Sequence, residues 1–273
     1  MNRQLIMGFE WFLYPLAGIL AGLMAGLLGV GGGLILVPIL VFLLPHQGVA
    51  DTSVMPMALA TSLAGIFLTG ISSAYAHHKR GAVLWTTTGW LAPGLLIGAA
   101  LGGIFAVQLE ARTLKIAVAV FCLLVAVQML SGWPRPAVRD ASRPARGPLY
   151  SLAGTVIGFV SSIVGIGGGS LTVPLLVTRG IAPVRAVATS SACGIVIALS
   201  SALTYASLSP ATGMPVGTVG FVNIPVALLI AVASMLSAPL GAKWSHRLPA
   251  QRLKQIFAGF LLLVAAILAN HAL

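Results

Sequence analysis

Charged side chains are scarce in this sequence, and acidic ones are the scarcest. Only 7% of the 273 residues are charged, and just four of them are Asp or Glu. An average soluble domain carries about 25% charged residues, so this chain could not cover a surface that faces water. Carboxylates are also nearly absent from the apolar segments, so the sequence shows no acidic proton relay and no Na⁺ site built from carboxylates.

Cysteine is rare as well, and catalytic motifs are missing. Cys122 and Cys193 both lie within apolar segments and share no spacing pattern, so neither a disulfide framework nor a metal site is indicated. The sequence has no HExxH motif and no workable Ser/His/Asp constellation, and no lysine-bearing phosphate loop follows Gly29–Gly33. We therefore expect a protein that is not an enzyme and that uses no metal and no cofactor.

Hydrophobic residues are what the sequence has in abundance. They make up 58% of the chain and give a mean hydropathy of +1.04. Segments rich in Leu, Ala, Val and Ile recur at lengths that span a bilayer, and they lack the alternation of a membrane β-barrel. We predict an all-α polytopic protein whose main partner is the lipid bilayer. The net charge of +11 is then explained by cytoplasmic loops rather than by nucleic-acid binding.

The two halves of the sequence repeat the same motifs in the same order. GLLGVGGGLILVP (26–38) corresponds to SIVGIGGGSLTVP (162–174), and ALATS (58–62) corresponds to AVATS (186–190). Later pairs are Pro93 with Pro225, expected at equivalent depths, and LEARTLK (109–115) with LPAQRLK (248–254). We predict a first transmembrane repeat over residues 1–131, a Pro/Arg-rich cytoplasmic linker over 132–148 and a second transmembrane repeat over 149–273.

The basic residues predict how each half is inserted, because positive loops stay cytoplasmic. If every apolar block crosses once, two strongly basic loops face opposite sides. If each glycine-containing block enters and returns as a hairpin, twelve of the 15 Lys and Arg residues share the cytoplasmic side. Each half is then a Gly-broken hairpin plus three transmembrane helices, and the halves form two inverted-topology repeats with both termini non-cytoplasmic. Whether the hairpins cross fully or are re-entrant is left open.

Each glycine cluster is expected to break a helix, because glycine permits backbone conformations that other residues avoid. A helix that restarts there presents free N–H groups and a positive dipole end. Two such starts, one from each half, are expected to converge on an anion near the midplane. The candidate substrate-binding residues are Gly31, Gly32, Gly33, Gly167, Gly168 and Gly169 in the clusters, Thr61, Ser62, Thr189 and Ser190 as hydroxyl donors, and Arg185 as a cation that draws anions inward.

Each candidate also has a purely structural interpretation. Glycine-rich membrane segments serve close helix packing, which is the favoured role for Gly18, Gly22, Gly26, Gly154 and Gly158 because of their small-xxx-small spacing. Membrane Ser and Thr commonly bond back to their own helix or to a neighbour. Arg185 alternatively only fixes the topology, and His77 and His78 are expected to be interfacial anchors.

The duplicated pattern G-x-x-x-G…G-[VI]-G-G-G-x-x-x-V-P, followed by A-T-S, resembles the sulfite exporter TauE/SafE family of bacterial inner-membrane permeases. The resemblance covers nearly the whole chain. It implies a multi-pass protein of the bacterial inner membrane that transports a small sulfur-containing oxyanion, such as sulfite, sulfoacetate or another organosulfonate, mostly outward. The halves are not identical, since Met57 stands where the second half has Arg185.

The sequence thus predicts a secondary permease that works by alternating access, with the anion bound at the two Gly-rich helix breaks. The alternatives are an anion channel or facilitator, and a membrane-embedded accessory or enzyme subunit. The particular anion, the direction of transport, the coupling ion and the oligomeric state are left open, with a homodimer among the options.

Overall fold

The computed structural model describes residues 3–28, 31–131, 146–208, 214–244 and 250–270, and these are almost entirely helical. The elements are α1 (Arg3–Leu28), α2 (Gly33–Leu43), the 3₁₀ turn η1 (Leu44–Gln47), α3 (Asp51–His78), α4 (Trp85–Gln108), α5 (Ala111–Ser131), α6 (Pro148–Val164), α7 (Gly169–Thr178), α8 (Pro183–Ser207), the hairpin strands β1 (Thr218–Val219) and β2 (Val222–Asn223), α9 (Ile224–Trp244) and α10 (Ala250–Asn270). Most of the predicted linker, residues 132–145, lies outside the described residues, as do Gly29 and Val30. The predicted all-α architecture is confirmed.

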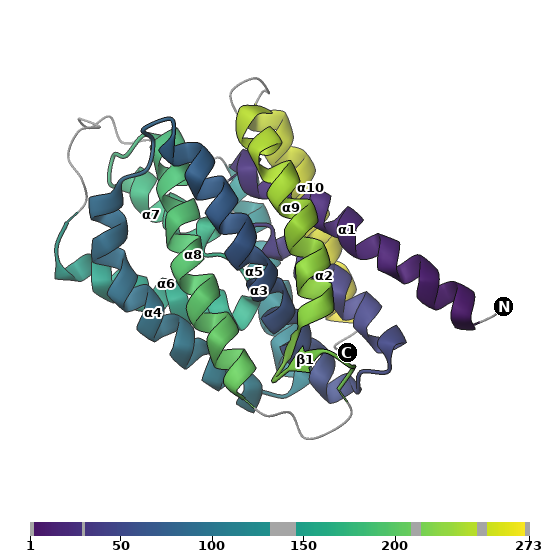
Figure 1. Ribbon diagram of the computed structural model, residues 1–273. Helices are drawn as coiled ribbons and strands as arrows, with labels where there is room; N and C mark the ends of the chain where they lie inside the picture. The colour runs from purple at the N-terminus through teal and green to yellow at the C-terminus, as the bar shows by residue number, and fades with distance from the viewer. Residues whose placement is uncertain (1–2, 29–30, 132–145, 209–213, 245–249, 271–273) are drawn as a thin grey trace.

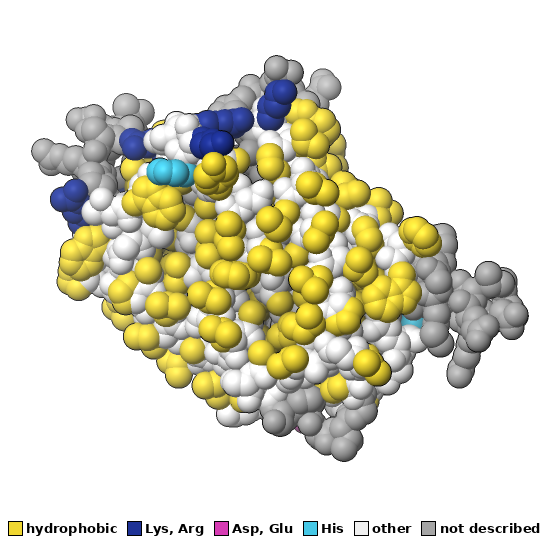
Figure 2. All heavy atoms as spheres, viewed as in Figure 1, with side chains coloured by type: hydrophobic (Ala, Val, Ile, Leu, Met, Phe, Trp, Pro, Cys, Tyr) yellow, Lys and Arg dark blue, Asp and Glu magenta, His cyan; other side chains and the backbone are white. Residues whose placement is uncertain are grey.

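The outer surface of the molecule is apolar. Five helices, α3, α4, α5, α8 and α9, are long and apolar enough to cross a membrane. Large hydrophobic side chains cover most of the face shown in Figure 2, and Phe12, Leu236 and Ile256 are each more than 70% exposed. A contiguous apolar surface of this size would associate in water, whereas lipid tails solvate it, so the chain is a multi-pass membrane protein.

Corresponding helices of the two halves pack in corresponding pairs. Helices α3 and α8 lie side by side in the middle, with α4 and α6 to one side and α1 and α9 to the other (Figure 1). The pair α1–α9 mirrors α6–α4, and α3–α9 mirrors α8–α4, while α5 packs on α10. This arrangement supports the internal duplication.

Glycines let these helix pairs approach closely. A Cβ on Gly18 of α1 would lie 2.5 Å from the carbonyl oxygen of Ile230, and a Cβ on Gly154 of α6 would lie 2.5 Å from that of Leu91. Gly22 and Gly158, one turn further on, meet the carbonyl oxygens of Ser234 and Leu95 in the same way. The packing role predicted for these four glycines is confirmed, as expected where small residues bring membrane helices together.

The glycine contacts also correct one detail of the sequence alignment. Leu91 and Ile230 occupy corresponding places although they are 139 residues apart, whereas Pro93 and Pro225 are 132 apart. Pro93 is the ninth residue of α4, and Pro225 is the second residue of α9. The prediction that the two prolines lie at equivalent depths is therefore wrong, because Pro225 starts its helix, where a missing N–H costs little.

Each glycine-broken segment folds back on itself as a hairpin. In the first, Gln47 of η1 donates from Nε2 to the hydroxyl of Tyr14 near the start of α1, at 2.7 Å. In the second, the guanidinium of Arg179, just after α7, lies over the ring of Tyr150 at the start of α6, 5.7 Å from its centroid. Tyr14 and Tyr150 are 136 residues apart, so corresponding residues tie both hairpins.

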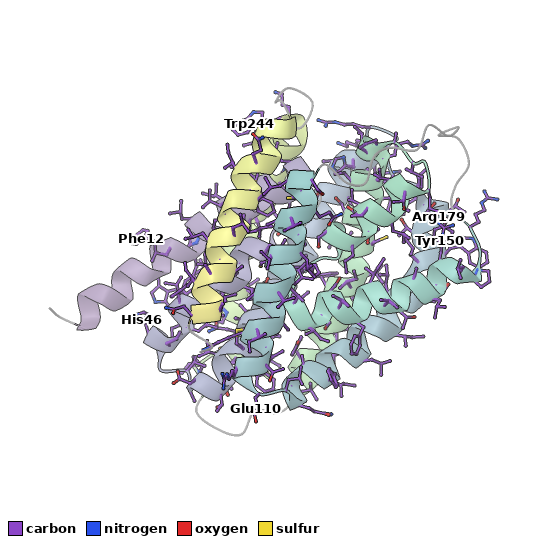
Figure 3. All side chains as sticks on the ribbon, turned by 180° about the vertical axis from the view of Figure 1, so that it is seen from behind. Phe12, His46, Glu110, Tyr150, Arg179 and Trp244 are labelled. Atoms are coloured by element: carbon purple, nitrogen blue, oxygen red, sulfur yellow. The ribbon has the colours of Figure 1, made fainter. Side chains whose placement is uncertain are left out.

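The two hairpins open toward opposite ends of the molecule. Lys and Arg side chains gather at one end of the face in Figure 2, and we call this the basic end. Seen from behind, Arg179 and Trp244 lie in its half of the molecule, whereas His46 and Glu110 lie toward the other end, here called the opposite end (Figure 3). This geometry supports inverted insertion of the halves, and the orientation in a bilayer stays a prediction.

Reporter fusions at Met1, Asp140 and Leu273 test that orientation. We expect a cytoplasmic signal at Asp140 only, because the basic end stays on the cytoplasmic side. Paired phosphatase and fluorescent reporters at the three positions measure it. Cytoplasmic signals at both termini would contradict the inverted arrangement.

Candidate functional site

The two glycine clusters interrupt their helices as predicted. Helix α1 ends at Leu28 and α2 begins at Gly33, while α6 ends at Val164 and α7 begins at Gly169. The residues that cap the new helices, Gly32 and Gly168, have φ angles of +60° and +73°. This left-handed backbone is strained for any residue with a side chain, which is why both positions need glycine.

The two breaks meet each other in the middle of the molecule. A Cβ placed on Gly31 would lie only 3.1 Å from the Cα of Gly167, its counterpart in the other half. The hydroxyl of Ser62 on α3 donates to the carbonyl oxygen of Gly165 at 3.2 Å. The structure therefore brings the start of α2 and the start of α7 to one place, far apart though they are in the chain.

A small polar cavity begins at this meeting point and extends toward the basic end. It is lined by Ala25, Gly31, Ile66, Thr69, Gly70, Ser73, Gly167, Ser190, Ser191 and Gly194. Its volume of about 20 Å³ is enough for about one water molecule. Helix α3 supplies Thr69 and Ser73, and α8 supplies Ser190 and Ser191, so hydroxyl groups line two walls and glycine backbone forms the floor.

The predicted site residues divide between the cavity and its support. Gly31, Gly167 and Ser190 line the cavity, while Gly32, Gly33, Gly168 and Gly169 form the helix starts beneath it. The structure places the remaining four, Thr61, Ser62, Thr189 and Arg185, outside the lining. Arg185 is the third residue of α8 and is half-buried, so its predicted attraction for anions would act from the basic end.

The two predicted threonines hold a pair of matching connections. Thr189 Oγ1 accepts the N–H of Leu84, the residue before α4, at 3.1 Å, and it donates to the carbonyl of Arg185 at 2.7 Å. Thr61 Oγ1 accepts the N–H of Asn223, the residue before α9, also at 3.1 Å. Each threonine thus fixes the entry to a helix of the other half, which is a positioning role.

These connections form a cap over each end of the α3–α8 pair. At the basic end, the N–H of Ala82 donates to the carbonyl of His77, the last buried residue of α3, at 3.2 Å. At the opposite end, the N–H of Phe221 donates to the carbonyl of Tyr205 on α8 at 3.1 Å. We call residues 82–84 the basic cap and residues 221–223 the opposite cap.

Three cavity residues, Thr69, Ser73 and Ser191, were not among the candidates from the sequence. Thr69 bonds to Ser234 of α9 at 2.5 Å, and Ser73 donates to Ser191 at 3.2 Å. Thr69, Ser73 and His77 recur every fourth residue, which places them on one face of α3 and is the signal that could have found them. The anchor role expected for His77 is wrong, because its side chain is only 2% exposed. His78 is exposed and accepts from Trp85 Nε1 at 3.1 Å.

The largest hollow in the described part of the chain lies elsewhere and does not suit an anion. It has a volume of about 850 Å³ and lies between α1 and α9, lined by Trp11, Leu228, Val232, Leu236 and other apolar side chains that face outward. Its one hydroxyl, on Ser237, donates to the carbonyl of Ile19. Lipid tails fill such a groove, so we place the site at the small central cavity. Among the described residues, no three of His, Cys, Asp or Glu come together to hold a metal ion.

Known proteins match this chain over almost its full length. The model of the family described as sulfite exporter TauE/SafE matches residues 14–268. A probable membrane transporter protein of Haemophilus influenzae is 37% identical over 92% of this chain and 94% of its own length. One from Methanocaldococcus jannaschii is 27% identical over 91% of each chain, and YunE of Bacillus subtilis is 26% identical over 90% of this chain and 93% of its own.

No solved structure matches the chain. The match of the family model spans the two hairpins, the central cavity and both caps, and the similar proteins are described as transporters. A membrane transporter is also what two helix breaks that meet around a small polar cavity inside an apolar bundle are suited to build. The chain belongs to the sulfite exporter TauE/SafE family of membrane transporters.

Proposed function

We propose that the protein is a secondary permease for a small sulfur-containing oxyanion, sulfite, sulfoacetate or another organosulfonate, in the bacterial inner membrane. The observation that carries the proposal is the hydroxyl-lined cavity over the contact between Gly31 and Gly167. The anion is bound there and exported by alternating access between the two halves.

The chemistry of the cavity suits an anion that is rich in oxygen. Hydroxyls of Ser73, Ser190 and Ser191 donate hydrogen bonds to sulfonyl or sulfite oxygens without burying a cation. The helix starts at Gly33 and Gly169 add the positive end of a dipole close to the cavity floor. The Lys and Arg side chains of the basic end raise the local concentration of anions at the side from which the cavity is reached.

The cavity is nevertheless too small for its substrate in this conformation. A volume that holds about one water leaves no room for sulfite, which has four heavy atoms. Binding therefore requires α3 and α8 to separate near Ser73 and Ser191. A pathway that is narrow in one state and wide in another is what alternating access requires, whereas a channel needs an open path from end to end.

Serine substitutions on α3 test the site. Ser73→Ala and Ser190→Ala are expected to raise the half-saturating anion concentration about ten-fold or more, because a hydrogen bond to a charged group contributes roughly 1.5–3 kcal/mol. Uptake of sulfite, sulfoacetate and thiosulfate into proteoliposomes measures it. Ser72→Ala is the matched control, since its hydroxyl points away from the cavity to the carbonyl of Met235, and it should leave transport unchanged.

The same measurement separates the proposal from its alternatives. Saturable flux that follows an imposed gradient supports a permease, and flux that does not saturate indicates a channel or facilitator. Purified protein that moves none of the three anions would contradict the proposal and favour an accessory role. Equal effects of Ser72→Ala and Ser73→Ala would move the site away from the cavity.

A further inference from the structure

Three serines near the second glycine cluster are buried without a hydrogen-bond partner. Ser161 and Ser162 at the end of α6, and Ser201 on α8, have no exposed surface. Their hydroxyl oxygens bond to nothing among the described residues. Buried hydroxyls almost always find a partner, and one that does not costs about 1–3 kcal/mol. Three such groups in one region point to a ligand that satisfies them in another state.

The three hydroxyls gather where α8 passes the end of α6. Ile197, Ser201 and Tyr205 recur every fourth residue and therefore share one face of α8. A Cβ on Gly168 would meet Ile197 and would lie 3.4 Å from Ser161 Oγ, and Tyr205 donates from its hydroxyl to the carbonyl of Ser162 at 3.1 Å. Ser201 lies between these two contacts, so it faces the end of α6 as well.

This group corresponds to the cavity in the first half of the chain. Ser201 stands 128 residues after Ser73, and Ser161 stands 136 residues after Ala25, the spacings that relate the two halves. Ser73 and Ala25 both line the cavity. From the contact between Gly31 and Gly167, the cavity extends toward the basic end, whereas Ser201 and Tyr205 lead along α8 toward the opposite end.

In this structure Tyr205 and the opposite cap close that second region. The Tyr205 side chain is fully buried, and its backbone carbonyl accepts the N–H of Phe221, which is itself 5% exposed. The corresponding places at the basic end hold His77 and the small residue Ala82. The bulkier pair therefore covers the hydroxyls of the second region, while the hydroxyls of the first still line an open space.

We propose that Ser161, Ser162 and Ser201 form a second half-site for the same small oxyanion, on the other side of the glycine contact. The inference rests on the proposed function. When the transporter opens to the opposite end, Tyr205 releases the Ser162 carbonyl and the three hydroxyls donate to the oxygens of the anion. The anion thus passes from the hydroxyls of the first half-site to those of the second.

Cysteine labelling tests the half-site directly. In a background with Cys122→Ala and Cys193→Ala, Ser201→Cys is treated with a membrane-impermeant maleimide applied to either face of sealed vesicles. We expect it to react only from the opposite end, at least five-fold faster when Tyr205→Phe is added, and more slowly with sulfoacetate present. Ser73→Cys is the matched control, which should react only from the basic end and become slower with Tyr205→Phe.

A second variant separates substrate contact from structure. Ser201→Ala removes an unpartnered hydroxyl, so it should leave thermal stability unchanged or higher while lowering sulfoacetate transport at least five-fold. Full transport by Ser201→Ala, or Ser201→Cys that labels from the basic end or not at all even with Tyr205→Phe, would overturn the half-site while the cysteine-free protein still transports. A cysteine-free protein that moves no anion would instead overturn the proposed function, and the half-site with it.

Discussion

Replacing Gly31 with alanine is expected to lower anion transport at least a hundred-fold. Gly31 has a φ angle of +82°, and a left-handed backbone costs a residue with a side chain roughly 1–2 kcal/mol. The new Cβ would also lie 3.1 Å from the Cα of Gly167, tighter than ordinary contact. The two breaks would have to move apart, and they form the floor of the cavity. Initial rates of sulfoacetate uptake per folded protein in liposomes measure the effect.

Gly48 offers a control that isolates the contact from the backbone strain. Its φ angle is +79°, yet a Cβ there would meet no described atom within 4 Å. Gly48→Ala therefore carries a similar strain without the approach of a second backbone, and we expect it to lose stability but keep its transport rate. Equal transport by the Gly31→Ala and Gly48→Ala variants would show that contact between the two breaks is not needed.

Gly98→Ala is expected to give the largest loss of stability. A Cβ at this position of α4 would fall on the carbonyl oxygen of Thr155 and 2.8 Å from its Cα in α6. Lipid supplies no hydrophobic force between helices, so close packing of this kind is what holds them together. Overpacking against rigid backbone costs about 1–3 kcal/mol or more. We expect a clearly lower thermal midpoint in detergent and less monodisperse protein in size-exclusion chromatography.

Gly89, on the same helix, provides the matched control. A Cβ there would meet no described atom within 4 Å, and alanine is about 1 kcal/mol more favourable than glycine in a helix. Gly89→Ala should therefore keep or raise the midpoint. An unchanged midpoint for Gly98→Ala would contradict the close packing of α4 on α6. Together, the Gly31 and Gly98 variants distinguish glycines that shape the cavity from glycines that join helices.

The sequence by itself determined the class of protein, the helix breaks and the hairpins. Long apolar runs with 7% charged residues exclude a soluble fold by the cost of exposing them to water. The glycine clusters break helices through local backbone freedom, and the breaks after Leu28 and Val164 are where they were predicted. The basic residues predict one cytoplasmic side because membrane insertion itself depends on loop charge. Each of these effects acts over short stretches of chain.

Only the tertiary structure decided which hydroxyl groups meet and what they contact. Thr61 and Thr189 hold the two caps, while the cavity is lined by Thr69, Ser73 and Ser191, which lie further along the same helices. In a soluble helix an apolar stripe shows which face is buried, but here both the lipid face and the core face are apolar. The rotation of α3 and α8 is instead set by close packing of small residues from both halves, and that packing exists only in the folded molecule.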